Sequence, residues 1–270
     1  MPYQNLNGIS SLEPSARSLR TFDVLIPSNS PHLLDRVGQL VLSCPQLQRL
    51  SIHAAGRLWP DHVLPRRLQD RTMAQFNTMS ASSWLSQHTN PPNLPLKLTS
   101  LELHNFCVCD CNWQDWEGLF DWSRLICVKF TCFSFLRNLQ GKLPKLRCLD
   151  LHLDTDRDCE YDCCKRYHSV PQIREFLLSC SGLVELGLTN GTDIVNKNLL
   201  VHLGGSLRRL SLHEYAMSEW MLRGDCDRPQ RPLLSKEQLE QIGCHCPLVR
   251  DLAVDVPYAD SDVSSVFLQL

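Results

Sequence analysis

The amino-acid sequence predicts an α/β solenoid, in which a parallel sheet forms the inner wall of an arc and helical return segments lie outside it. Two observations support this prediction. The segment Leu-x-x-Leu-x-Leu, with other apolar residues accepted at its three fixed places, recurs eight times along the chain. Amphipathic stretches that read as helices separate several of the copies, and parallel strands require such crossover connections.

The spacing of the copies assigns the class of repeat. Four intervals between successive copies are 21, 24, 27 and 28 residues long. This is the range of leucine-rich repeats, whose units each supply one strand and a return segment and bury their apolar face only by stacking. Longer intervals of 51, 37 and 42 residues predict insertions at 54–97, 153–170 and 214–234, although the longest could also hold an unrecognised repeat. We therefore predict one right-handed leucine-rich repeat domain, with irregular repeats, over residues 1–270.

Each copy predicts one short strand, in which side chains point alternately into the core and out of it. The predicted strands lie near 20–25, 48–53, 99–104, 126–131, 147–152, 184–189, 208–213 and 250–255.

The return segments predict helices by their apolar periodicity and end signals. These helices span 31–43, 171–179, 192–203, 236–242 and 260–270. The third is expected to end at Gly204-Gly205, because glycine commonly terminates helices. Ser235 and Gln238 form a capping box at the start of the fourth, which is expected to stop at Gly243. The segment 260–270 would cover one end of the core.

Composition and charge exclude several classes of protein. The chain has 270 residues, of which 43% are hydrophobic and 21% charged, as in an ordinary globular protein. Its net charge of -2, with no run of lysine and arginine longer than a pair, argues against a nucleic-acid partner. The first 25 residues contain Glu13 and Asp23 and lack a continuous apolar stretch, so neither a signal peptide nor a membrane anchor is predicted. We expect an intracellular protein of the cytoplasm, the nucleus or both.

Three of the 14 cysteines have a repeated position. Cys44, Cys180 and Cys246 each lie three residues before the first apolar residue of a predicted strand. A small apolar thiol suits the turn from a helix into a strand, so these cysteines are interpreted as structural and reduced.

Two clusters contain residues that can bind metal ions. Cys107–Cys111 and Cys159–Cys164, with His168 nearby, do not have the Cys-x2-4-Cys spacing of zinc sites. The segment from Asp154 to Lys165 opens like a calcium loop but lacks its central glycine and final glutamate. No metal and no cofactor is therefore predicted, and a composite zinc site between the two loops is the alternative.

The outward positions of the predicted strands form the candidate binding surface, on the concave face. They carry charges of both signs, a pattern that is more typical of a protein-binding surface than of a deep substrate pocket. A merely solvated strand face is the alternative. The candidate contact residues are Arg49, His53, Glu102, His104, Lys129, Thr131, Asp150, His152, Glu185, Thr189, Arg209, His213 and Asp251.

Histidine occupies the third outward place in four of the eight strands. The chain has ten histidines, far too few for this enrichment to arise by chance. One interpretation is a recognition strip that responds to pH or accepts hydrogen bonds from a partner. The other is a side-chain ladder that stabilises neighbouring strands. No catalytic residue is predicted, because the chain has no phosphate-binding glycine loop, no Gly-x-Ser-x-Gly and no His-Glu-x-x-His.

Three segments carry a family resemblance. They are Leu-Ser-Cys-Pro-Gln-Leu-Gln-Arg-Leu-Ser-Ile from Leu42, Leu-Pro-Lys-Leu-Arg-Cys-Leu-Asp-Leu from Leu143 and Cys-Ser-Gly-Leu-Val-Glu-Leu-Gly-Leu from Cys180. They resemble the cysteine-containing leucine-rich repeats of F-box proteins, particularly the irregular forms of fungi, over residues 17–256. The resemblance implies a substrate receptor, in which an F-box docks a Skp-type adaptor of a cullin-RING ubiquitin ligase and the repeats hold the protein to be ubiquitinated.

The chain departs from this family in two ways. It has no recognisable F-box, since Leu64-Pro65 is followed by Arg66-Arg67 and by no matching apolar helices. A Skp-type adaptor is therefore expected only where an F-box lies outside this chain or has diverged within it. The place eight residues after the first leucine of each repeat, where the family has asparagine or cysteine, holds Pro27, Ala55, Phe106, Phe133, Asp154, Gly191, Tyr215 and Pro257.

Together, the repeats and the resemblance predict a non-catalytic protein–protein interaction module, the substrate-recognition part of an SCF-type ubiquitin ligase. One alternative is a free-standing repeat scaffold without a ubiquitin connection. The other is a metal- or redox-responsive protein that uses the cysteine-rich loops.

Overall fold

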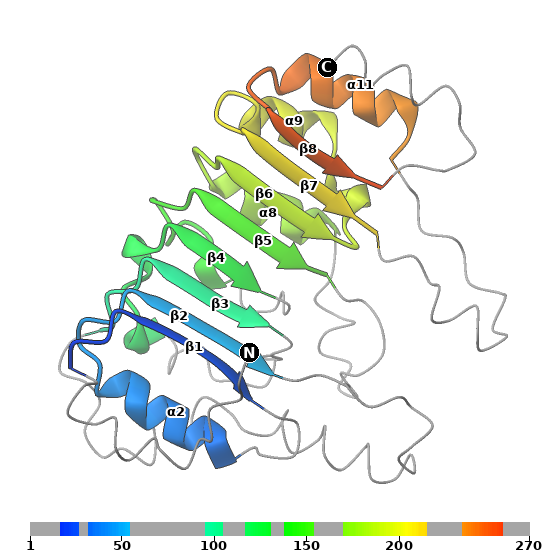
Figure 1. Ribbon diagram of the computed structural model, residues 1–270. Helices are drawn as coiled ribbons and strands as arrows, with labels where there is room; N and C mark the ends of the chain where they lie inside the picture. The colour runs from blue at the N-terminus through cyan, green and yellow to red at the C-terminus, as the bar shows by residue number, and fades with distance from the viewer. Residues whose placement is uncertain are drawn as a thin grey trace, which may run out of the picture.

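Eight strands form one all-parallel sheet in the computed structural model of the chain (Figure 1). The structure describes residues 17–26, 32–54, 95–104, 117–130, 138–153, 170–214 and 234–255. Strands follow one another across the sheet in chain order, which confirms the predicted α/β class and the parallel sheet. The strands are β1 Thr21–Ile26, β2 Arg49–Ala54, β3 Ser100–His104, β4 Cys127–Phe130, β5 Cys148–His152, β6 Glu185–Thr189, β7 Arg209–His213 and β8 Asp251–Val254.

Every strand begins one residue later than predicted, because the preceding residue belongs to a turn that is repeated at each step. In that turn one carbonyl oxygen accepts hydrogen bonds from two successive N–H groups of the next coil. The carbonyl of Gln48, for example, accepts from the N–H groups of Thr99 and Ser100 at 2.7 and 3.1 Å. The same arrangement occurs at all seven steps between neighbouring strands, so the coils stack with one turn geometry at this edge.

The strand register aligns the same place of every repeat, which stacks the fixed apolar residues into one continuous core. Leu50, for example, pairs with Leu101, and Leu101 pairs with Val128. In the inner coils these residues are almost completely buried. Phe22 on β1 and Leu252 on β8 are only partly buried, because each terminal strand has a neighbour on one side alone.

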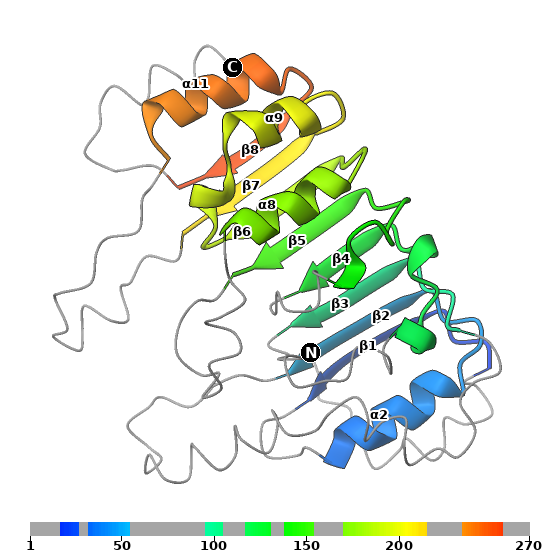
Figure 2. The same cartoon turned by 180° about the vertical axis from the view of Figure 1, so that it is seen from behind.

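The helices lie on one side of the sheet (Figure 2). They are α2 His32–Leu42, α8 Val170–Ser179, α9 Lys197–Leu203 and α11 Lys236–His245, and the short 3-10 helices are η2 Trp122–Arg124 and η3 Thr192–Ile194. On α8 the predicted apolar side chains Ile173, Phe176 and Leu177 are all buried. None of the described helices covers the opposite side of the sheet, which is called the open face below (Figure 1).

The predicted helix 192–203 is interrupted, so this prediction was wrong in its continuity. Residues 192–194 form η3, and α9 begins only at Lys197. Between them Asn196 has an extended backbone, and its side-chain oxygen accepts a hydrogen bond from the N–H of Leu199 at 3.0 Å. An asparagine that caps the following turn starts a new helix instead of continuing the previous one.

The capping box of α11 is confirmed, but its predicted end is wrong. Ser235 accepts from the N–H of Gln238, and the Gln238 side chain accepts from the N–H of Ser235. The helix continues through Gly243 to His245. It ends where Cys246 precedes a proline, because a residue before proline disfavours the helical conformation.

The three repeated cysteines are structural, as predicted. Cys44, Cys180 and Cys246 are buried free thiols at the turn from a helix into a strand. Each thiol donates a hydrogen bond to a helical carbonyl, with sulfur–oxygen distances of 3.0, 3.4 and 3.7 Å respectively. The accepting oxygens of Leu40, Phe176 and Leu200 each accept another hydrogen bond as well, so the thiols supply an additional donor to carbonyls near the helix ends.

Several predicted features lie outside the described residues. They include nearly all of the three insertions, the two cysteine-rich loops and the terminal helix 260–270. The single-domain organisation therefore stays a prediction. Within the described ranges, no helix has the length and apolar character needed to cross a membrane.

Candidate functional site

The open face carries three rows of side chains that run across the strands. The first row is Thr21, Arg49, Ser100, Cys127, Cys148, Glu185, Arg209 and Asp251. The middle row is Asp23, Ser51, Glu102, Lys129, Asp150, Gly187, Ser211 and Ala253. The third row, called the histidine row, is Leu25, His53, His104, His152, Thr189 and His213. All predicted contact residues lie in these rows except Thr131, which is outside the described residues.

The first row ends in a group of exposed charges. Arg209 lies between two carboxylates, with its Nη1 atom 3.2 Å from Glu185 and its Nε atom 3.3 Å from Asp251. Exposed ion pairs contribute only about 0–1 kcal/mol to folding stability. These charges therefore define the electrostatic pattern of the surface more than they hold the sheet together.

Two thiols lie side by side in the first row. Cys127 and Cys148 are register partners on β4 and β5, and both are free. Burial raises the pKa of Cys127, and burial together with the Glu185 carboxylate and Cys127 raises the pKa of Cys148 to about 11. Both groups are therefore neutral thiols near pH 7, and they contribute no negative charge to this face.

In the middle row, opposite charges again lie on neighbouring strands. Lys129 Nζ is 3.6 Å from the Oε2 atom of Glu102, which is also 3.6 Å from Nε2 of His104. This glutamate thus connects the middle row with the histidine row.

The histidine row brings three of the four predicted imidazoles together. The rings of His53 and His104 are stacked, with centroids 4.3 Å apart and planes 6° from parallel. His104 also meets His152 edge to face at 6.1 Å. His213 lies beyond Thr189, which pairs with His152 on one side and with His213 on the other.

A carboxylate accompanies each of the four imidazoles in this row. The nitrogen–oxygen distances are 3.6 Å for His53 and Asp23, 3.6 Å for His104 and Glu102, 3.8 Å for His152 and Asp150, and 3.3 Å for His213 and Asp255. Ser51 is a further neighbour, with its hydroxyl 2.8 Å from Nε2 of His53.

His104 is the imidazole whose ionisation the surroundings change most clearly. Burial lowers the pKa of His104, and the nearby His53 ring lowers it further. Glu102 acts in the opposite direction but does not reverse the shift. The stacked pair is therefore built around a ring that resists protonation.

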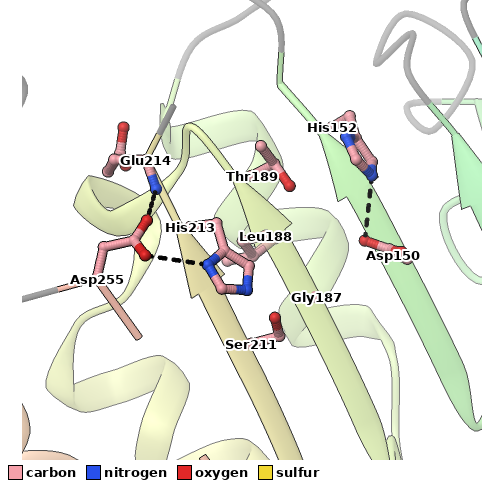
Figure 3. Close-up of a pocket in the computed structure, with 9 residues that line it drawn as sticks. All are labelled: Asp150, His152, Gly187, Leu188, Thr189, Ser211, His213, Glu214 and Asp255. Carbon is pink, nitrogen blue, oxygen red and sulfur yellow. Dashed lines mark hydrogen bonds and ion pairs between the residues drawn. The ribbon is translucent and has the colours of Figure 1, made fainter. Parts of the chain in front are cut away.

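The open face contains a pocket of about 370 Å³ at the carboxyl ends of β5, β6 and β7 (Figure 3). The pocket brings together four predicted contact residues, namely Asp150, His152, Thr189 and His213. Its other lining residues are Gly187, Leu188, Ser211, Glu214 and Asp255. The predicted residues of β2, β3 and β4, and those of the first row, do not line it.

Glu214 and Asp255 line the pocket beside His213, although neither is among the predicted contact residues. Glu214 is buried, and its Oε1 atom accepts hydrogen bonds from the N–H and the hydroxyl of Thr192 at 2.9 and 2.7 Å. Asp255 accepts from the N–H of Glu214 at 2.7 Å and faces His213 (Figure 3). Both residues directly follow a strand, where the alternation of side chains no longer predicts direction. Asp255 could have been found from the repeat pattern, because it holds the third outward place, which histidine occupies in four other repeats.

Gly187 also lines the pocket without being among the predicted contact residues. A Cβ atom at this position would lie 2.6 Å from Oδ1 of Asp150. The missing side chain lets the Asp150 carboxylate lean over the neighbouring strand, which no periodicity in the sequence reveals.

The geometry of the open face suits hydrogen bonds and ion pairs with another molecule. Among the residues that the structure describes, no three histidine, cysteine, aspartate or glutamate side chains are grouped as a metal ion would need. No protein-family model matches the chain, and no curated protein matches it at a significant level. Its function is therefore inferred from the arrangement of these rows and this pocket.

Proposed function

We propose that the chain is a non-catalytic protein-binding module of the leucine-rich repeat type, and that its open face is the binding surface. One observation supports this most directly. Eight strands in continuous register present rows of polar and charged side chains on a side of the sheet that none of the described helices covers.

The size of this face agrees with a protein partner. Strands about 4.8 Å apart and about 17 Å long give the eight-stranded face an area of roughly 600 Å². One side of a typical protein–protein interface buries about 800 Å². The face thus has most of the required area before the relief of its side chains is counted.

The pattern of charge also favours a protein partner. Glu102 beside Lys129, and Arg209 between Glu185 and Asp251, alternate in sign across the strands. Mixed charges on neighbouring strands select a complementary partner and reject others. A nucleic acid would instead require a uniformly basic surface.

Assignment to the leucine-rich repeats rests on the spacing of the copies and on the turn geometry common to all seven steps. The resemblance to F-box proteins then implies a narrower role, in which the bound protein is a substrate for ubiquitination. A free-standing scaffold would use the same face without a ligase.

Site-specific photocrosslinking tests the binding surface. A photoreactive amino acid would replace the exposed open-face residues Leu25 or Ala253, which take part in no ion pair of the described chain. Val201 on α9 and Leu178 on α8, which are 56% and 42% exposed, provide control positions on the helical side. The proposal expects one protein to be crosslinked in cells from both open-face positions and from neither control. Crosslinking from the helical side alone, or from no position, would refute it.

The ligase role needs a separate measurement. Affinity purification of the full chain together with its crosslinked partner should also recover a Skp-type adaptor. Repeated recovery of the partner without an adaptor would reject the ligase role and favour the scaffold.

A further inference from the structure

We infer that the pocket between His152 and His213 receives the guanidinium group of an arginine side chain from the bound protein. This inference rests on the proposed function, and it defines the chemistry that the partner must present at one point of the open face. Size, charge and hydrogen-bonding groups all lead to the same occupant.

The pocket is large enough to admit a long side chain. Its volume of about 370 Å³ is near the lower end of the ~300–1,000 Å³ range for ligand pockets. It opens on the same face as the rows described above, so a protein lying across the strands could insert a side chain without rearrangement (Figure 3).

The charge of the lining selects a cation. Three carboxylates line the pocket, from Asp150, Glu214 and Asp255, and its lining includes no lysine or arginine. Elsewhere on the face, Glu102 and Glu185 each lie within 3.6 Å of a lysine or arginine. In the pocket, Asp150 and Asp255 are accompanied by the imidazoles of His152 and His213, at 3.8 and 3.3 Å. A phosphate or carboxylate ligand would be repelled here, whereas a cation would complete the local balance of charge.

Two hydroxyl groups of the pocket lining have no hydrogen-bond partner among the residues that the structure describes. Thr189 is only 6% exposed, and its hydroxyl makes no hydrogen bond within the described part of the chain. It lies between the two histidines and lines the pocket (Figure 3). The hydroxyl of Ser211, one strand away, likewise has no hydrogen bond among the described residues. Both hydroxyl groups can therefore accept a hydrogen bond from a donor group that enters the pocket.

The arrangement of the rings favours a flat cation. His152 and His213 flank Thr189 at a separation of two strand spacings, about 10 Å. The nitrogen of His213 that faces Asp255 is Nδ1, and the other ring nitrogen points away from that carboxylate (Figure 3). A guanidinium group stacks on aromatic faces and donates five N–H groups in one plane. It can therefore contact a ring, a hydroxyl and the Asp150 carboxylate together, which a compact ammonium group cannot.

The test uses small probes, so that it does not depend on finding a partner. N-acetyl-arginine amide would be titrated into the full chain at constant pH and followed by the imidazole NMR signals of His152 and His213. The lysine and citrulline counterparts supply a cation of different shape and a neutral group of nearly the same shape. We expect the arginine probe to shift both signals, with binding about ten-fold tighter than that of either counterpart.

Variants locate the binding. Asp150→Asn keeps the shape but removes the charge and should weaken the arginine probe about ten-fold. Glu240→Gln removes an exposed carboxylate on α11, on the helical side of the sheet, and should leave binding unchanged. Thr189→Val is a second, uncharged test and should weaken the probe several-fold, with circular dichroism confirming that each variant is folded.

Equal binding of the arginine and citrulline probes would overturn the inference. Equal binding of the lysine probe, or an Asp150→Asn variant that binds like the original chain, would overturn it as well. These outcomes are separate from the proposed function. A chain that binds the probe but is crosslinked to no protein refutes the binding module and leaves only the selectivity of the pocket for a guanidinium group. A partner captured without any response to the probe refutes the arginine pocket and leaves the binding module.

Discussion

Gly204 illustrates how one residue sets the distance between two helices. Its backbone is right-handed helical, with φ at -59°, so no left-handed conformation requires glycine there. A Cβ atom would instead lie 1.8 Å from the carbonyl oxygen of His245, at the end of α11. The glycine that the sequence marks as a helix terminator is needed because two backbones approach closely.

Replacing Gly204 with alanine should therefore destabilise the fold. The added methyl group meets backbone atoms that cannot rotate away, and overpacking of this kind costs about 1–3 kcal/mol. Gly205→Ala is the matched control, since nothing lies within 4 Å of its Cβ position. Urea denaturation of both variants measures the difference, and equal stabilities would contradict the close approach.

The buried thiols provide a second prediction at the scale of single residues. Burial raises the pKa values of Cys180 and Cys246 to about 11, from an ordinary value of 9.0. Their thiolate fractions at pH 8 thus fall by about 100-fold, and the thiolate is the reactive form. Alkylation followed by peptide mass spectrometry should show both cysteines reacting at least ~100-fold more slowly than the exposed Cys244. Comparable rates would mean that these thiols are accessible in solution.

His104 predicts a dependence of stability on pH. Its pKa in the folded chain is lowered, chiefly by burial, and unfolding restores the ordinary value of 6.5. As the pH falls through 6.5, the unfolded chain binds a proton that the folded chain refuses, so the free energy of unfolding decreases. Above that pH the contribution is fully present.

The slope due to one such proton is at most ~1.4 kcal/mol per pH unit. The His104→Gln variant should therefore lose stability less steeply than the original chain between pH 7 and pH 5. Denaturation curves at several pH values measure this, and an unchanged slope would show that His104 is not responsible.

At the scale of elements, the sequence correctly predicted those features of the helices that depend on residues close together in the chain. The capping box of α11 and the apolar face of α8 need only residues three or four apart, and both were predicted. The break between η3 and α9 was missed, because Asn196 can continue a helix or cap the next one with the same sequence around it. Tertiary packing decides between the two.

The candidate site, like the helices, was predictable only in part. Strand alternation correctly assigned Asp150, His152 and His213 to one face, because the repeat fixes both spacing and direction. It could not identify Gly187 or Glu214, whose roles depend on contacts between different coils. The sequence thus reveals which residues share the open face, but it does not reveal the contacts that shape the pocket.

The capping box of α11 supports a prediction for that element. Ser235→Ala removes the acceptor for the N–H of Gln238 and should cost about 1 kcal/mol of stability. Ser235→Asp keeps an acceptor at the helix start and should remain close to the original stability. Thermal unfolding of the two variants gives the comparison, and a neutral alanine variant would show that α11 does not depend on its cap.

At the scale of the whole molecule, stacking explains both the fold and its exposed surface. Each coil repeats one turn, and its apolar residues are buried only by the coils on either side. The outward residues take no part in that core, so they are free to vary in charge and size. The apolar core and the proposed binding surface thus lie on opposite sides of the same strands.

The affinity of the crosslinked partner for charge-reversal variants tests the central claim most directly. Arg209→Glu reverses a charge in the first row, where the exposed ion pairs contribute little to folding. Lys236→Glu makes the same change at the start of α11, where a negative charge suits the helix dipole. Calorimetric titration should show binding at least ~10-fold weaker for Arg209→Glu and unchanged for Lys236→Glu. Equal affinities for Arg209→Glu and the original chain, or an equal loss at Lys236→Glu, would contradict a partner bound on the open face.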